Sequence, residues 1–247
     1  MTRAVEQRFL DCLQLVSRQA GSVARHLQGK VKAQKKSGPG SPEGEALTAV
    51  DLAVQDVILH ALAAALPETA VDAEEDTAML GRFPAEDGRR PVVIIDPIDG
   101  TLNYIRKSND YAVMAALSMD GTYRSAVVYF PVDDSLFWAV AGRGAWRQTG
   151  PEQPQRLSIK NLPQIVLVTP PVSTARRASL AAAGWEIQQS RCSAVDSTAP
   201  LTGRAVGSVS AKTAGRRRAI GFLLTVEAGG VVAYADGRRW EGEDPGA

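Results

Sequence analysis

Two carboxylates separated by a proline-led turn are the residues of this chain best suited to chemistry. In the segment Val92–Thr101, a run of four β-branched residues leads directly into Asp96, and Asp99 follows after Pro97 and Ile98. An acidic pair, Glu74-Glu75, lies upstream. Hard divalent cations need several oxygen ligands, and Mg²⁺ in phosphate-processing sites is held by carboxylates, water and substrate phosphate. The pattern therefore predicts a divalent-cation site at a strand end rather than a solvated turn.

The composition gives no general attraction to nucleic acid or to a membrane. The chain has 247 residues, of which 45% are hydrophobic and 22% charged, and its formal net charge is +1. Two cysteines do not make a disulfide framework and indicate a reducing compartment. The charged start of the sequence does not resemble a signal peptide, and no apolar run reaches membrane-spanning length. We therefore expect a cytoplasmic protein that binds neither nucleic acid nor membranes.

The elements expected to position the acidic residues lie in the first half of the chain. Apolar residues recur at helical spacing from Val5 to Leu27, which predicts an amphipathic helix. A second helix is expected from about Thr48 to Pro67, and a short strand over 70–73 would then deliver Glu74 at its end. The intervening lysine- and glycine-rich segment 30–45 predicts a loop, either a solvated linker or a segment that orders around a metal or phosphate.

The remainder of the chain predicts a β-rich middle and a mixed last third. Apolar runs at 111–119, 125–130 and 136–141, punctuated by turn residues, predict a meander packed against helices. The strands expected in the last third are 165–168, 206–211 and 231–235, and the helices expected there are 174–183 and 219–228. We expect a single unit with a metal-binding part over about 1–150 and a smaller α/β part over about 151–247.

The acidic pair and the segment Asp96–Thr101 together resemble the inositol monophosphatase family of Mg²⁺-dependent phosphomonoesterases, which includes bisphosphate nucleotidases. Further similarity lies in Leu47–Asp51, in Gly142–Ala145 and in Glu227–Gly230. The resemblance is close over roughly residues 5–146 and thin afterwards. It implies a layered α-β-α-β-α sandwich of the inositol monophosphatase and fructose bisphosphatase type, a homodimer, and Mg²⁺ as the cofactor, with Mn²⁺ as an alternative.

The resemblance also implies roles for individual residues. Glu74, Asp96 and the backbone carbonyl of Ile98 would hold a first metal ion, and Asp96 with Asp99 would hold a second. Glu74, helped by Thr101 and Asp51, would orient or deprotonate the attacking water. The amides of Gly100 and Thr101 would face the phosphate, and Arg191 falls within a segment that contacts substrate in the family.

One departure from the family pattern changes the sign of a charge. The family carries a Trp-Asp ahead of its Glu-Ala-Gly-Gly turn, and the matching position here is Arg217. Three explanations are open. Arg217 or a neighbour replaces one metal's charge and binds substrate phosphate, the protein is a weak or inactive relative, or Asp196 or Asp236 supplies the missing carboxylate.

These observations predict a Mg²⁺-dependent hydrolase that acts on a phosphate monoester of a small sugar, cyclitol or nucleotide. The catalytic residues expected are Glu74, Asp99, Thr101 and Asp51, and Arg217 and Arg191 are expected to contact substrate. The alternative is a catalytically weak or inactive homologue that binds a phosphorylated ligand or a partner. A third hypothesis is that the substrate is a bisphosphate and that the arginines at 216–218 bind its second phosphate.

Overall fold

Two long helices form one outer layer of the protein. The computed structural model describes residues 2–30, 34–35, 46–47, 49–159, 162–211 and 215–246. Helices α1 (Thr2–Leu27) and α2 (Ala49–Ala65) pack against each other, and both ranges agree with the sequence-based expectation. Thr48 and most of the 30–45 segment lie outside the described residues, so the predictions made for them are not tested.

A seven-stranded sheet lies behind these helices, with its strands in the order in which they occur along the chain. The strands are β3 (Ala70–Ala73), β4 (Val92–Asp99), β5 (Ala112–Met119), β6 (Thr122–Phe130), β7 (Ser135–Val140), β8 (Gly144–Thr149) and β9 (Gln155–Arg156). The pair β3 and β4 is parallel, whereas every later pair is antiparallel. Because Ala73 lies opposite Ile95 in this pair, Glu74 and Asp96 follow at adjacent positions on neighbouring strands.

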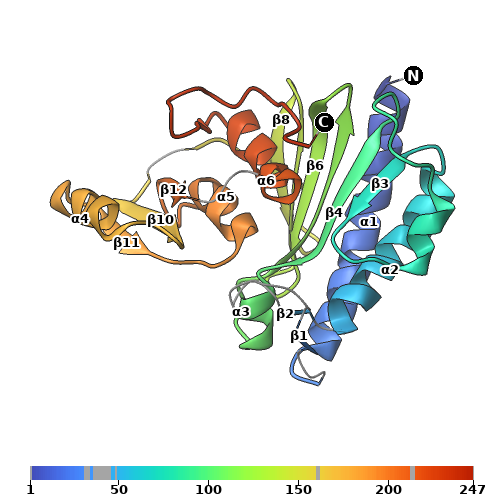
Figure 1. Ribbon diagram of the computed structural model, residues 1–247, viewed down its shortest axis with the longest axis horizontal. Coiled ribbons are helices and arrows are strands. Elements are labelled where there is room, and N and C mark those ends of the chain that lie inside the picture. The colour runs from blue at the N-terminus through green and yellow to red at the C-terminus, as the bar shows by residue number, and fades with distance from the viewer. Residues whose placement is uncertain are drawn as a thin grey trace.

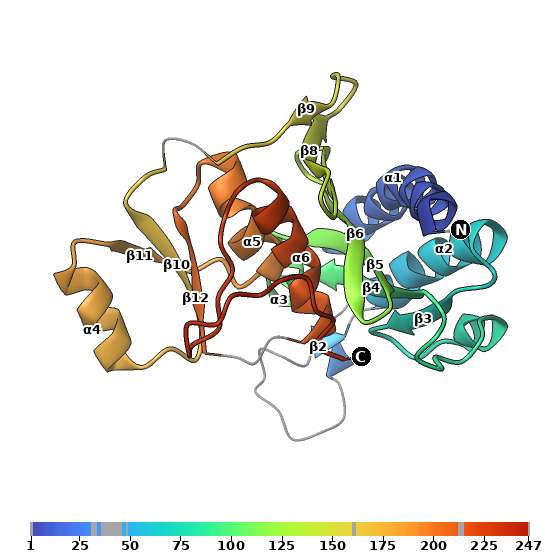
Figure 2. The ribbon, with the colours of Figure 1, turned by 90° about the horizontal axis from the view of Figure 1, so that it is seen from above.

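Further layers follow on the other face of the sheet. Helices α5 (Ser193–Thr202) and α6 (Arg216–Glu227) pack together, with α6 against β6 and α5 against β12. A parallel three-stranded sheet comes next, with β10 (Ile165–Thr169) between β11 (Glu186–Gln188) and β12 (Gly207–Ser210), and α4 (Thr174–Ala182) lies against β11. Figures 1 and 2 show this succession of helix and sheet layers, from α1 and α2 at one end to α4 at the other. The layered α-β-α-β-α fold predicted from the sequence is therefore confirmed.

Strand β4 is apolar throughout because both of its faces are covered. Val93 and Ile95 are fully buried against the α1 and α2 side, whereas Ile94 is fully buried in the second core, which α6 also lines. A strand covered on both faces reads as a continuous apolar run rather than as an alternation. The first carboxylate that breaks this run, Asp96, therefore emerges from between two hydrophobic cores.

Three expectations about elements need correction. The strand expected over 92–95 continues to Asp99, with an irregular register between Asp96 and Asp99 because Pro97 has no N–H to donate. The strand expected over 231–235 is not formed, and only an isolated bridge joins Ala233 to Arg239. Helix α5 was not expected at all.

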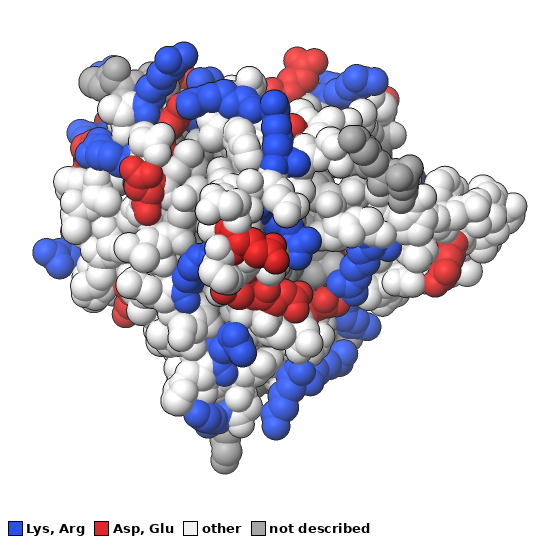
Figure 3. Space-filling view, turned by 180° about the vertical axis from the view of Figure 1, so that it is seen from behind, with Lys and Arg blue, Asp and Glu red and all other residues white. Residues whose placement is uncertain are grey.

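The shorter elements connect these layers. They are β1 (Gln34–Lys35), β2 (Ala46–Leu47), the 3₁₀ helix η1 (Ala78–Arg82) and α3 (Thr101–Ile105), and β1 pairs with β2. None of the described helices combines the length and the apolar character needed to cross a membrane. On the face shown in Figure 3, acidic side chains gather near the centre with basic side chains around them, so neither sign of charge extends across the face.

Candidate metal and phosphate site

The segment that carries Glu74 is held in place by a glutamine of α2. Gln55 is fully buried, and its side-chain amide donates to the Glu75 carbonyl at 2.5 Å while its amide oxygen accepts from the Glu75 N–H at 2.9 Å. These two bonds satisfy the backbone just beyond the end of β3, where the sheet ladder stops. Glu74 is thereby fixed at the end of β3 and next to the end of β4.

Asp96 is a buried carboxylate with an unused oxygen. The residue is 6% exposed, and its Oδ1 has no hydrogen-bond partner among the described residues. Burial raises the pKa of Asp96 well above its ordinary value, and the nearby Glu74 and Asp99 carboxylates raise this pKa further, whereas Arg217 opposes the rise. A buried, repelled carboxylate with a free oxygen is the arrangement that a bound cation stabilises.

The turn after β4 brings backbone groups to the same place. Thr101 donates its hydroxyl hydrogen to the Ile98 carbonyl at 3.0 Å, which leaves that carbonyl one further lone pair. Gly100 has a φ of 86°, and a Cβ on this residue would lie 2.8 Å from the Asp110 carbonyl and 3.1 Å from Cys192 Cβ. The turn thus needs glycine both for its backbone conformation and for its close contact with Cys192.

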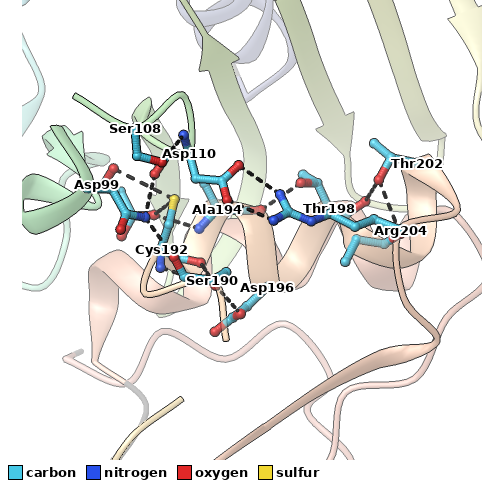
Figure 4. A network of polar contacts seen from close by, with 12 residues as sticks. Asp99, Ser108, Asp110, Ser190, Cys192, Ala194, Asp196, Thr198, Thr202 and Arg204 are labelled. Atoms are coloured by element: carbon cyan, nitrogen blue, oxygen red, sulfur yellow. Dashed lines mark hydrogen bonds and ion pairs between the residues drawn. The ribbon is translucent and has the colours of Figure 1, made fainter. Parts of the chain in front are cut away.

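Asp99 faces the start of α5 rather than Asp96. Its Oδ2 accepts from Cys192 Sγ at 2.8 Å and from the Ala194 N–H at 2.7 Å, and its Oδ1 accepts from the Ser193 hydroxyl at 2.8 Å. Figure 4 shows Cys192 and Ala194 turned toward the Asp99 carboxylate. The Asp99 carboxylate therefore accepts one N–H of the first turn of α5, that of Ala194, together with two side-chain donors beside it.

These contacts fit one cation better than two. Glu74, the free oxygen of Asp96 and the Ile98 carbonyl offer the oxygen donors that Mg²⁺ prefers, with room for water and phosphate among its remaining ligands. Among the described residues, however, no three His, Cys, Asp or Glu side chains converge as a ready metal cage, since Asp99 is directed to α5. A second ion between Asp96 and Asp99 would require Asp99 to leave its partners.

Arg217 places a positive charge beside these carboxylates. Its Nη2 donates to Asp72 Oδ1 at 3.0 Å and to the Ala73 carbonyl at 2.6 Å, and its Nε donates to the Ile95 carbonyl at 3.2 Å. The guanidinium is thus bound across the ends of β3 and β4, immediately before Glu74 and Asp96. A cation already lies where the family pattern would place a ligand carboxylate.

The structure also places two further predicted residues, Asp51 and Arg191. Asp51 is 2% exposed in the first turn of α2, and its carboxylate adds to the rise that burial causes in the pKa of Tyr104 in α3. Arg191, with a φ of 58°, directly precedes the Cys192 that contacts Asp99. The roles assigned to these two residues stay predictions.

Neither of the two aspartates considered as replacements contacts the candidate ligands through a hydrogen bond. Asp196 accepts from the Ser190 hydroxyl at 2.5 Å and from the Thr169 hydroxyl, and Asp236 accepts from the Arg238 N–H in the C-terminal segment. Both carboxylates therefore have partners away from the candidate ligands, and the role considered for them stays a prediction.

Sequence reasoning missed the partners of Asp99 and Arg217. Cys192, Ser193 and Asp72 make these contacts across 93, 94 and 145 positions of the sequence. The one local signal is Asp196, because acidic residues are enriched in the first turn of a helix. Such a signal predicts a helix but not the carboxylate that it binds.

Comparison with known proteins agrees with this geometry. Residues 6–246 match the model of the inositol monophosphatase family. A Streptomyces griseus protein named glucose-1-phosphate thymidylyltransferase is 37% identical over 127 residues, which are 51% of this chain and 46% of that protein. Tomato inositol monophosphatase 3 is 33% identical over 141 residues, 52% of each chain. The chain thus spans about half the length of the curated relatives it matches.

Solved structures share the fold over nearly the whole chain. The match to an IMPase of Thermotoga maritima has a TM-score of 0.73 at 20% identity and covers 97% of this chain and 91% of that one. An IMPase/NADP phosphatase solved with Mg²⁺ and phosphate also gives a TM-score of 0.73 at 20% identity, covering 96% and 87%. The family match, the layered fold and the acidic strand ends agree, and the chain belongs to the inositol monophosphatase family.

Proposed function

We propose that the protein is a Mg²⁺-dependent phosphoric monoester hydrolase that acts on a small phosphorylated metabolite. The observation that carries the proposal is the buried Asp96 carboxylate, which has an oxygen without a hydrogen-bond partner among the described residues and lies close to Glu74 at the ends of a parallel strand pair. Named relatives support it, since they include inositol monophosphatases and a histidinol-phosphatase of Chlorobaculum parvum. We propose Mg²⁺ as the natural ion, with Mn²⁺ as a substitute.

The residues present suit an in-line displacement by water. A Mg²⁺ ion held by Glu74, Asp96 and the Ile98 carbonyl would lower the pKa of a bound water and neutralise phosphate charge. Glu74 would take the proton of the attacking water, and Thr101 and Asp51 would help Glu74 to orient that water. The water oxygen would then bond to phosphorus while the ester P–O bond breaks. The leaving alkoxide would take a proton from solvent and depart as the alcohol, and Glu74 would return its proton to solvent. No phosphoenzyme is needed in this scheme.

The test is phosphate release by the purified protein with Mg²⁺, with Mn²⁺ or with EDTA. Substrates would be inositol 1-phosphate, histidinol phosphate, sugar phosphates and 3′-phosphoadenosine 5′-phosphate, with Asp96→Asn and the exposed Asp87→Asn as matched variants. We expect metal-dependent turnover that Asp96→Asn abolishes and Asp87→Asn retains. An Asp96→Asn protein that turns over at the wild-type rate would overturn the proposal.

A second candidate function has its own support. Asp99 is bound by three donors of the α5 segment and Arg217 lies across the strand ends, so the site is already partly neutralised without a second ion. We propose, as the alternative, a homologue that binds a phosphorylated ligand without hydrolysing it. A folded protein that binds inositol 1-phosphate by calorimetry but releases no phosphate would favour this alternative.

A further inference from the structure

A large cavity adjoins the candidate metal site on the α5 side. It has a volume of about 810 Å³ and lies between α5, α6, β12 and the segment 230–235 that follows α6. Ser193 lines this cavity, and the same side chain donates its hydroxyl hydrogen to Asp99 at 2.8 Å. The cavity therefore begins one side chain away from a carboxylate of the candidate site.

The walls of the cavity combine apolar surface with hydroxyl groups. Phe222 and Val232 contribute apolar surface, and Ser197, Ser208 and Thr225 contribute polar groups. Cavities of 300–1,000 Å³ with mixed walls are typical of small-molecule sites. The volume is sufficient for a metabolite much larger than a phosphate ion.

The charged side chains that line the cavity differ in whether they already have partners. Arg238 donates to Glu243 at 3.0 Å, and its guanidinium lies 4.0 Å from the centre of the Tyr234 ring. Asp196 is held by the hydroxyls of Ser190 and Thr169. Because Arg238 and Asp196 already have partners within the protein, neither side chain is well placed to bind a charged ligand.

Two arginines of the cavity make no such bonds. Arg176 of α4 and Arg218 of α6 have no side-chain hydrogen bond or ion pair to another described residue. Arg218 lies close enough to Asp196 to oppose the rise that burial causes in the pKa of that carboxyl. Because Asp196 already accepts two hydroxyl hydrogens, the donors of Arg218 remain available.

The three consecutive arginines at the start of α6 have separate partners. Arg216 is bound to Glu86, Asp72 and Asp244, and its side chain is 10% exposed. Arg217 is bound to Asp72 and to two strand carbonyls. Of these three arginines, Arg218 is thus the one that lines the cavity and has no bound partner among the described residues.

We propose that this cavity receives the part of the substrate beyond the phosphate that is cleaved, and that Arg218 and Arg176 select substrates with a second anionic group. The inference rests on the proposed function and specifies its substrate class as bisphosphates or phosphorylated carboxylates. Guanidinium groups bind phosphate and carboxylate through paired N–H donors, which a neutral hydroxyl does not match.

The experiment compares substrates that differ in the second anion. We would measure kcat/KM for fructose 1,6-bisphosphate against fructose 6-phosphate, and for 3-phosphoglycerate against glycerol 2-phosphate, with Mg²⁺ present. The proteins are wild type, Arg218→Gln, Arg176→Gln and the exposed Arg89→Gln as control. We expect wild type and Arg89→Gln to prefer the two-anion compound by about tenfold or more, and each cavity variant to lose most of that preference. The first pair reports on phosphate as the second anion and the second pair on carboxylate.

The outcomes separate this inference from the proposed function. Equal kcat/KM within both pairs, with no change of the ratio in Arg218→Gln, would overturn the inference while the hydrolase assignment stands. If no compound is hydrolysed, calorimetric binding of fructose 1,6-bisphosphate to the metal-free protein decides. Binding weakened about tenfold in Arg218→Gln but not in Arg89→Gln would support the cavity as an anion site, and equal binding by all variants would overturn it.

Discussion

Replacing Arg217 with aspartate is predicted to add a metal ion to the protein. In wild type the guanidinium donates three hydrogen bonds, to Asp72 at 3.0 Å, to the Ala73 carbonyl at 2.6 Å and to the Ile95 carbonyl at 3.2 Å. We therefore expect wild type to bind one ion and Arg217→Asp to bind two, because the variant removes the competing cation and supplies the carboxylate that Asp99 does not offer while it is bound to α5. Arg217→Gln, which removes the charge alone, should still bind one.

The magnitude of the effect on the first ion follows from the lost charge. At the effective dielectric of a protein surface, a nearby unit charge is worth on the order of 1–2 kcal/mol, so the first ion should bind roughly tenfold more tightly to Arg217→Gln. Loss of the three hydrogen bonds of Arg217 in Arg217→Gln should, in contrast, lower the stability of the fold. Since Arg217 and Asp72 are about a third exposed, we expect the free energy of unfolding to fall by only about 1 kcal/mol.

The assay is a Mn²⁺ titration followed by electron paramagnetic resonance, in which free Mn²⁺ is measured directly and the number bound is obtained by difference. The control is Arg82→Asp, which reverses the charge of an exposed side chain that makes no hydrogen bond or ion pair to another described residue. Two ions on wild type, or a single ion on Arg217→Asp that is folded by circular dichroism, would refute the interpretation of Arg217 as a built-in cation.

Two further changes test the buried carboxylate and the packing of α5 on α6. The pKa of Asp96 is raised in the folded state, so folded protein binds more protons than unfolded protein and stability falls as pH rises above the unfolded value of about 4. Metal-free Asp96→Asn should therefore melt a few degrees above wild type at pH 7–8, since 1 kcal/mol is worth about 2–4 °C in a chain of this size, and the gap should close toward pH 4. Calorimetric scans at several pH values check this, and a variant that melts below wild type at pH 8 would contradict it. A Cβ on Gly221 would lie 2.0 Å from Ser197 Oγ and 2.5 Å from Ser197 Cβ, so Gly221→Ala should cost about 1–3 kcal/mol in urea unfolding. Gly81→Ala, with nothing within 4 Å of its added Cβ, is the matched control, and equal midpoints for the two variants would contradict the packing described.

The part of the fold around the acidic strand ends could be predicted from the sequence because its signals are local. The helical spacing from Val5 to Leu27 and the four β-branched residues before Asp96 each indicate one element without reference to the rest of the chain. The parallel pairing of β3 with β4 was not among these predictions, because the short, partly buried segment 70–73 does not identify its neighbour.

The last third could not be predicted as well, because its helices carry weak periodic signals. Helix α5 consists largely of small residues and contains Pro200, so neither apolar spacing nor propensity marks it. The segment 231–235 has the composition of a strand, but among the described residues it pairs only locally, at the isolated bridge between Ala233 and Arg239. Strand formation depends on a partner that only the tertiary structure supplies.

The contacts of the candidate site also depend on tertiary structure. The acidic motif predicted Glu74, Asp96 and Asp99 as neighbours, and the charges of the other two do raise the pKa of Asp96. That the Asp99 carboxylate is taken up by the start of α5, and Arg217 by Asp72, depends on packing between segments far apart in sequence. Such pairings leave no spacing pattern that a single sequence would reveal.

The most direct test of the account measures Mn²⁺ binding and phosphate release on the same preparations of wild type, Asp96→Asn and Asp87→Asn. We predict that wild type and Asp87→Asn bind the ion and release phosphate with the same half-saturating metal concentration, and that Asp96→Asn loses both. Phosphate release by Asp96→Asn at the wild-type rate, or release by wild type that persists in EDTA, would contradict the assignment of the β3 and β4 ends as the metal site of a hydrolase.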